Sequence, residues 1–113
     1  MFSKQQRLNS RAVNRIIIGK HRFFTSCFRV HFEPADAFRV ALIIPKKIIP
    51  KRVMRSRQKR RILHVLKSFV NNISPSTCHI LLILQKNTQD VSFVDLEKEV
   101  ELVIQKLPTS DKI

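Results

Sequence analysis

The stretch from Ile44 to Val70 constrains this chain more than any other part of its sequence. Between Lys46 and Arg61 it holds nine basic residues: Lys46, Lys47, Lys51, Arg52, Arg55, Arg57, Lys59, Arg60 and Arg61. The nearest carboxylates along the chain are Asp36 and Asp90. Ion pairs within one helix cannot balance this charge, because they need acidic residues three or four positions away. We therefore expect a polyanion as the missing partner.

A helix over about residues 51–72 would hold this charge in place. On a helical wheel, one broad apolar stripe is formed by Ile62, Leu63, Val65, Leu66, Phe69 and Val70. This stripe is typical of a helix that packs on a core. Arg57 and Arg60 fall on the opposite side, whereas Arg55 and Lys59 continue the line of the stripe. A basic tail or a localisation signal would not need such a stripe.

Composition indicates one folded domain whose binding surface lies outside the C-terminal segment. The chain has 113 residues, of which 43% are hydrophobic, so we expect a single domain over residues 1–113. Residues 1–89 hold 19 Lys and Arg against 2 Asp and Glu, whereas residues 90–113 hold 3 against 6. Such a charge favours nucleic acid or an anionic membrane. Because no apolar run approaches about 20 residues and no signal-peptide core is present, we expect a soluble, cytoplasmic protein with no membrane partner.

Residues 10–18 are predicted to form a short amphipathic helix. Asn9 or Ser10 would cap its start. Gly19, the only glycine of the chain, would end it as a C′ residue. Arginines at every fourth position would line its outer side.

Two alternating patterns predict strands over residues 23–32 and 38–44. In the first, apolar residues alternate with Arg29 and His31, so one face would be core and the other polar. We expect these two strands to pair as an antiparallel hairpin.

The C-terminal half adds one more strand and one more helix. Residues 78–86 are apolar on both faces and are predicted to form the innermost strand. A capping pattern at Ser92 and Asp95 predicts a helix over residues 93–107. The predicted order is α-β-β-α-β-α, an α+β two-layer sandwich with a small mixed sheet and a β-α-β crossover.

The basic run resembles the signature of the bacterial ribonuclease P protein family, which has a Lys-Lys pair, a short spacer and then Arg-Asn-Arg-x-Lys-Arg. The matching positions are Lys46, Lys47, Arg55, Arg57, Lys59 and Arg60. Ser56 stands where the family has Asn, and Leu63 stands where it commonly has Arg. The resemblance covers nearly the whole chain. It implies a left-handed crossover between the second and third strands, although the general default is right-handed.

The resemblance also implies a function and its partners. In the family, a catalytic RNA subunit holds the catalytic metals, expected to be Mg²⁺, and the protein contacts that RNA through its Arg-rich helix. The nine basic residues named above are therefore the predicted RNA-binding set. The family also receives the 5′ leader of precursor tRNA in a cleft between the first helix and the sheet. For this leader site the predicted residues are Phe24, Phe28, Arg29, His31 and Lys86. No DNA partner is expected.

The residues themselves offer little catalytic chemistry. A two-metal nuclease needs converging carboxylates, but residues 37–89 contain none. The four histidines are dispersed, and one glycine cannot build a phosphate-binding loop. Cys27 and Cys78 lie in no metal-ligand spacing and are predicted to be buried free thiols. We predict no catalytic residue and no metal ligand in this chain.

Three functions remain open from the sequence. The main hypothesis is a ribonuclease P protein subunit that removes tRNA 5′ leaders only within a ribonucleoprotein. The alternative is a non-catalytic RNA-binding module, such as a ribosomal protein or an RNA chaperone. A self-sufficient nuclease is the third. Identification of the bound RNA would separate the first two.

Overall fold

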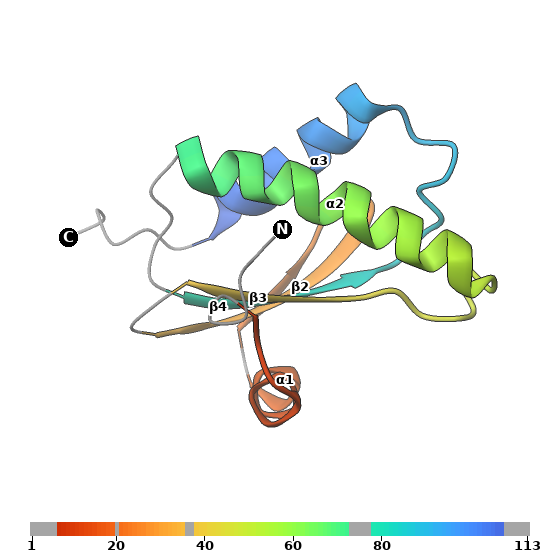
Figure 1. Ribbon diagram of the computed structural model, residues 1–113. Coiled ribbons are helices and arrows are strands. Elements are labelled where there is room, and N and C mark those ends of the chain that lie inside the picture. Colours follow the sequence, from red (N-terminus) through yellow and green to blue (C-terminus); the bar gives the residue numbers. More distant parts are fainter. Residues whose placement is uncertain (1–6, 20, 36–37, 73–77, 108–113) are drawn as a thin grey trace.

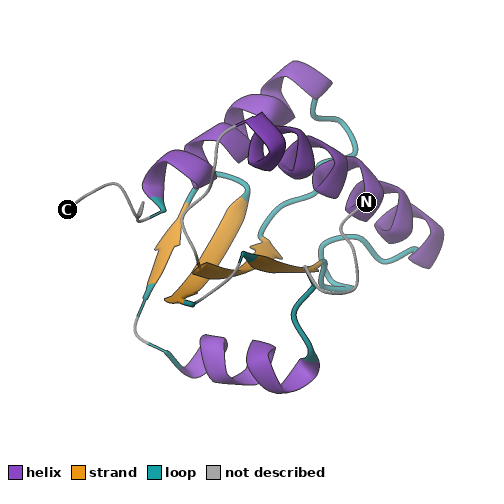
Figure 2. Ribbon diagram, turned by 60° about the vertical axis from the view of Figure 1, so that its left-hand side comes forward, coloured by secondary structure: helices purple, strands orange, loops and turns teal. Residues whose placement is uncertain are grey.

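A computed structural model shows a four-stranded sheet with helices on both of its faces (Figure 1). It describes residues 7–19, 21–35, 38–72 and 78–107. The elements are α1 (Ser10–Ile18), β1 (Arg22–Phe24), β2 (Phe28–Pro34), β3 (Arg39–Ile43), α2 (Arg52–Asn72), β4 (Cys78–Leu84) and α3 (Phe93–Lys106). Helices α2 and α3 lie together on one face, and α1 lies on the other, as Figure 2 shows from a second direction. The predicted α+β class is confirmed, and the helices begin and end within one residue of their predicted bounds.

The order of the strands in the sheet is β1-β2-β4-β3. Strand β4 is antiparallel to β2 and parallel to β3. The predicted hairpin between residues 23–32 and 38–44 is therefore wrong, because β4 lies between these two segments. The prediction of an inner position for β4 is confirmed, and its apolar residues on both faces explain that position. Helix α2 makes the crossover from β3 to β4, and its left-handed sense stays a prediction.

The segment predicted as one strand over residues 23–32 is two strands joined by a tight turn. The backbone N–H of Thr25 donates to the carbonyl oxygen of Phe28 at 2.8 Å. The backbone N–H of Phe28 in turn donates to Thr25 Oγ1 at 3.1 Å. Strands β1 and β2 consequently pair as an antiparallel hairpin, with Phe24 opposite Arg29. Aromatic residues on both sides of the turn hid it in the sequence.

The main core lies between the sheet and the pair α2 and α3. It is built from the inner faces of β2, β3 and β4 and from the apolar sides of both helices: Phe28, Val30, Val40, Leu42, Ile62, Leu63, Val65, Leu66, Ile80, Leu82, Leu84, Leu96, Val100 and Val103. The described part of the predicted α2 stripe is thus confirmed as core, whereas the side chain of Val70 lies outside the described residues. Cys27 and Cys78 are buried free cysteines, as predicted.

Polar side chains set the starts of the two shorter helices. The side chain of Asn9 accepts a hydrogen bond from the Ala12 N–H at 2.8 Å, and that of Ser92 accepts one from the Asp95 N–H at 3.1 Å. Gly19 does end α1, but its φ of −65° is not left-handed. A Cβ there would lie 3.2 Å from the carbonyl oxygen of Ile16, so close approach favours glycine at this end. No helix in the described part of the chain is long and apolar enough to cross a bilayer.

Candidate nucleic-acid interface

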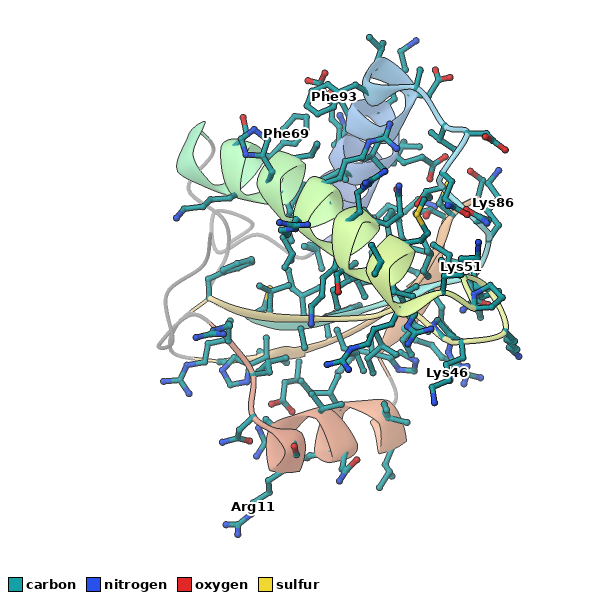
Figure 3. The ribbon with its side chains drawn as sticks, turned by 45° about the vertical axis from the view of Figure 1, so that its right-hand side comes forward. Arg11, Lys46, Lys51, Phe69, Lys86 and Phe93 are labelled. Atoms are coloured by element: carbon teal, nitrogen blue, oxygen red, sulfur yellow. The ribbon has the colours of Figure 1, made fainter. Side chains whose placement is uncertain are left out.

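Seven of the nine predicted RNA-binding residues are exposed on α2 and the loop that precedes it: Lys46, Lys47, Lys51, Arg52, Arg57, Lys59 and Arg60. Figure 3 shows Lys46 and Lys51 close to the N-terminal end of α2. The first turn of α2 contains no acidic residue, so its positive dipole end adds to this charge. No carboxylate in the described part of the chain pairs with these cations, so together they can attract a polyanion.

The other two arginines of the set are partly buried and bind backbone carbonyls. Arg55 Nη1 donates to the carbonyl oxygens of Ile49 at 3.0 Å and Pro50 at 2.7 Å, which fixes the turn that leads into α2. Arg61 Nη1 donates to the carbonyl oxygen of Thr88 at 3.0 Å, and its Nη2 donates to that of Val91. Both side chains therefore also hold the fold around the basic surface.

Sequence reasoning missed a buried polar pair beside Arg61. Gln58 and Thr88 are almost fully buried, and Thr88 Oγ1 donates to Gln58 Oε1 at 2.9 Å. Arg61 Nη1 also donates to Gln58 Oε1, at 3.3 Å. The signal in the sequence was the position of Gln58, four residues before Ile62 and hence on the buried side of the helix.

The predicted leader residues divide between the two faces of the sheet. Phe24 and Arg29 lie opposite each other on the face toward α1, and the Phe24 side chain is 57% exposed. Lys86 is exposed just after β4, beside the β1–β2 turn, where the Gln85 N–H donates to the Cys27 carbonyl oxygen at 2.7 Å. Phe24 and Lys86 are accessible from solvent, and Arg29 is partly so. Phe28 is not, because it points into the main core.

His31 also differs from its predicted role as an accessible contact. It lies on the face that α1 covers and is fully buried. Its Nε2 accepts a hydrogen bond from Arg29 Nε at 2.8 Å. Burial, together with the charges of Arg29 and Arg22, lowers the pKa of His31 below its usual value. Alternation assigned His31 to the polar face correctly but could not show that a helix covers this position.

The carboxylate of Glu33 on β2 pairs with Arg15 and thereby links α1 to the sheet. Arg15 Nε donates to Glu33 Oε2 at 3.2 Å, and Arg15 Nη2 pairs with Oε1. His79 Nδ1 lies 3.1 Å from the same Oε1. The hydrogen bond from Arg15 is the main cause that lowers the pKa of Glu33 below its usual value. One arginine of the predicted outer row is thus a structural contact.

Metal-binding groups do not gather in the described part of the chain. No three His, Cys, Asp or Glu side chains there lie close enough together to hold an ion. The two positions that depart from the family pattern lie in different surroundings. Ser56 is exposed on α2, whereas Leu63 is buried in the main core. The exposed chemistry is therefore cationic on α2 and, on the opposite face of the sheet at Phe24, aromatic.

Comparison with known proteins finds one matching family model and several similar solved structures. The family model described as ribonuclease P matches residues 2–108. The structure is similar to that of the Staphylococcus aureus RNase P protein, with a TM-score of 0.75, 22% sequence identity, and coverage of 88% of this chain and 93% of that one. It is also similar to the Thermotoga maritima RNase P protein, with a TM-score of 0.79, 18% identity, and coverage of 90% and 97%. No curated protein sequence matches this chain.

Proposed function

We propose, since this chain belongs to the ribonuclease P protein family, that it binds the 5′ leader of precursor tRNA while an RNA subunit carries out the cleavage. Membership makes the chain a protein subunit of ribonuclease P, an endoribonuclease that processes tRNA, and gives it an RNA partner.

The basic surface of α2 is the proposed contact with the RNA subunit. The single observation that carries this assignment is the row of exposed cations without a described carboxylate partner, centred on Arg57 and Arg60. Each cation that neutralises a phosphate releases counterions from the RNA, which makes binding strong at low salt and weak at high salt. Arg55 and Arg61 support the same surface from beneath through their bonds to backbone carbonyls.

The leader site is proposed on the α1 face of the sheet. Phe24 offers an exposed ring directly across the β1–β2 pair from Arg29, whose guanidinium donates to His31. Unpaired bases stack on such rings, and a neighbouring cation attracts the phosphate between them. Lys86 adds a second cation beside the turn. His31 is buried beneath this face, and Phe28 lies in the main core on the opposite face of the sheet, so neither is proposed to touch the leader.

Magnesium is proposed to be held by the RNA subunit. The described residues supply no cluster of carboxylates, and nucleophile activation by a two-metal site needs such a cluster or its equivalent from phosphates. This chain would then contribute binding and orientation of RNA, and no proton transfer is assigned to its side chains. A cytoplasmic location and the absence of a DNA partner belong to the same proposal.

Identification of the RNA that copurifies with the protein tests this function. The proposal predicts one structured catalytic RNA together with tRNA precursors that still carry their leaders. The Arg57→Ala, Arg60→Ala double variant should lose both, because it removes two exposed cations and leaves the core intact. Recovery of ribosomal RNA instead would favour the ribosomal-protein alternative.

A further inference from the structure

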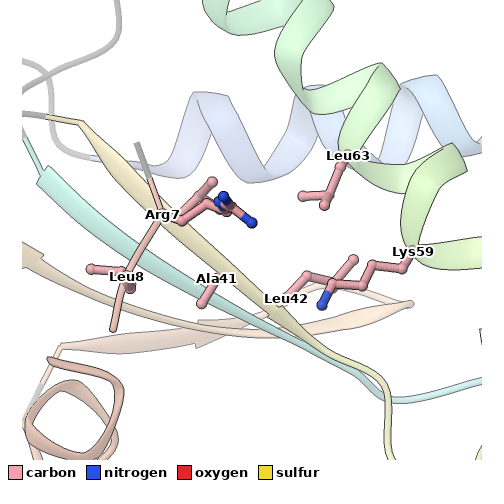
Figure 4. A pocket seen from close by; sticks show the side chains of 7 residues that line it. Arg7, Leu8, Ala41, Leu42, Lys59 and Leu63 are labelled. Carbon is pink, nitrogen blue, oxygen red and sulfur yellow. The ribbon is translucent and has the colours of Figure 1, made fainter. Parts of the chain in front are cut away.

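A pocket of about 330 Å³ lies between the outer edge of β3 and the underside of α2 (Figure 4). Its lining residues come from three parts of the chain: Arg7, Leu8, Val40, Ala41, Leu42, Lys59 and Leu63. Pockets for small organic ligands begin at about 300 Å³. This one is therefore large enough for a single organic group. It faces α2, whereas the proposed leader site lies on the opposite face of the sheet.

Two cations reach over this pocket from opposite sides. Figure 4 shows Arg7 extending from the segment beside β3 and Lys59 extending from α2 toward it. Both side chains are exposed, and no carboxylate in the described part of the chain pairs with either. Two unpaired like charges at one site favour an anion between them.

The backbone of Arg7 is fixed in this position. Arg7 forms an isolated parallel bridge with Val40, and the Leu8 N–H donates to the Val40 carbonyl oxygen at 3.1 Å. The chain before α1 thereby extends the outer edge of the sheet beyond β3. Arg7 is consequently held at the rim of the pocket by main-chain contacts rather than by its own side chain.

The wall of the pocket is apolar, which an inorganic ion does not require. This apolar wall is formed by Val40, Leu42 and Leu63, which are only 2%, 6% and 8% exposed. A second hollow continues from it along α2, since Leu42 and Lys59 line both and Arg52, Arg55 and Ser56 line its far part. A ligand that combines a flat apolar group with phosphate matches these features together.

We propose that this pocket binds one unpaired nucleotide of the RNA subunit, with the base against Val40, Leu42 and Leu63 and a phosphate between Arg7 and Lys59. The bases of a duplex are stacked and paired, so only a single-stranded or bulged nucleotide can enter. No aromatic side chain lines the pocket, so the base is held by burial against aliphatic groups. The inference rests on the proposed function for the source of the nucleotide.

The test uses the full chain with labelled methyl groups and two probes, uridine 5′-monophosphate and inorganic phosphate. The nucleotide should shift the NMR signals of the Val40, Leu42 and Leu63 methyl groups, and inorganic phosphate should leave them in place. Arg7→Ala and Lys59→Ala should each weaken nucleotide binding about tenfold, as loss of one charge-assisted contact does. Arg11→Ala, which removes an equal charge from exposed α1, should have no effect.

Three results would overturn the proposal: no methyl shift with the nucleotide, equal shifts with inorganic phosphate, or shifts that survive loss of both Arg7 and Lys59. The same protein preparation would be assembled with the RNA subunit and assayed on precursor tRNA. Cleavage by that assembly together with an inert pocket would reject the pocket alone. Lack of assembly with any catalytic RNA would instead reject the proposed function.

Discussion

Arg61 on α2 donates a hydrogen bond from Nη1 to the backbone carbonyl oxygen of Thr88, 3.0 Å away and 27 residues later in the chain. The basic helix therefore fastens the loop between β4 and α3 with one of its own cations. The bond ties α2 to the C-terminal part of the fold, and it gives one residue of the predicted RNA-binding set a structural role.

Arg61→Ala should destabilise the protein by about 1–3 kcal/mol, because it leaves the partly buried acceptors around Thr88 without their donor. Urea unfolding followed by circular dichroism measures this change. Arg60→Ala is the matched control: its side chain is exposed, so its effect on stability should stay within about 0.5 kcal/mol. Equal stability of the two variants would show that the contact to Thr88 contributes nothing.

Charge on the outer side of α2 should dominate affinity for RNA. If the surface neutralises about five phosphates, the logarithm of the binding constant should fall with the logarithm of salt concentration with a slope of about −3.5 to −4.5. Replacing Arg57 and Arg60 by Ala should make this slope shallower by about 1 to 2. Filter binding over a salt series measures it. An unchanged slope in a fully stable variant would move the RNA surface elsewhere.

The sequence predicted the positions of helices and strands better than it predicted which strands lie side by side in the sheet. The apolar stripe that includes Ile62 and Leu66 located α2, because a period of 3.6 is a local property. Alternation in a strand identifies its faces but not the strand beside it, so the insertion of β4 between β2 and β3 was not predictable. The same reason hid the burial of His31.

Contacts between distant residues were also beyond the sequence. Gln58 and Thr88 are 30 positions apart, and Arg15 and Glu33 are 18 apart. Side chains of these polar types are mostly exposed to solvent in proteins. The sequence therefore does not reveal their partners, which only the tertiary fold brings together. The exposed cations of α2 were predictable because no nearby acid exists for them at any helical spacing.

Phe24 should act on the leader and not on the rest of the substrate. In the assembled enzyme, Phe24→Ala should weaken binding of precursor tRNA with a long leader by about 1–3 kcal/mol, the usual loss for one stacked base. A substrate with a single leader nucleotide should be nearly unaffected. Phe93→Ala on α3 is the control, since its ring is 48% exposed but lies away from the α1 face. Equal losses on both substrates would remove Phe24 from the leader site.

Stability should fall as the pH decreases below about 6.5, through His31. Burial next to Arg29 and Arg22 lowers the pKa of His31 from 6.5, so the unfolded chain binds this proton more readily than the folded one. The variant His31→Leu lacks this titrating group, so its free energy of unfolding should change less between pH 7.5 and 5.5. Glu33 does not interfere, because its lowered pKa confines its effect to pH below 4.5. An identical pH dependence in both proteins would contradict this assignment.

The most direct test of the account is cleavage of precursor tRNA with and without the RNA subunit, at a fixed Mg²⁺ concentration. Purified protein freed of RNA should leave the precursor intact, because its described residues gather no carboxylates for a two-metal site. Addition of the cognate catalytic RNA should restore removal of the 5′ leader, and Arg57→Ala with Arg60→Ala should raise the protein concentration that this requires. Robust Mg²⁺-dependent cleavage by the RNA-free protein would contradict the division of labour proposed for the two subunits.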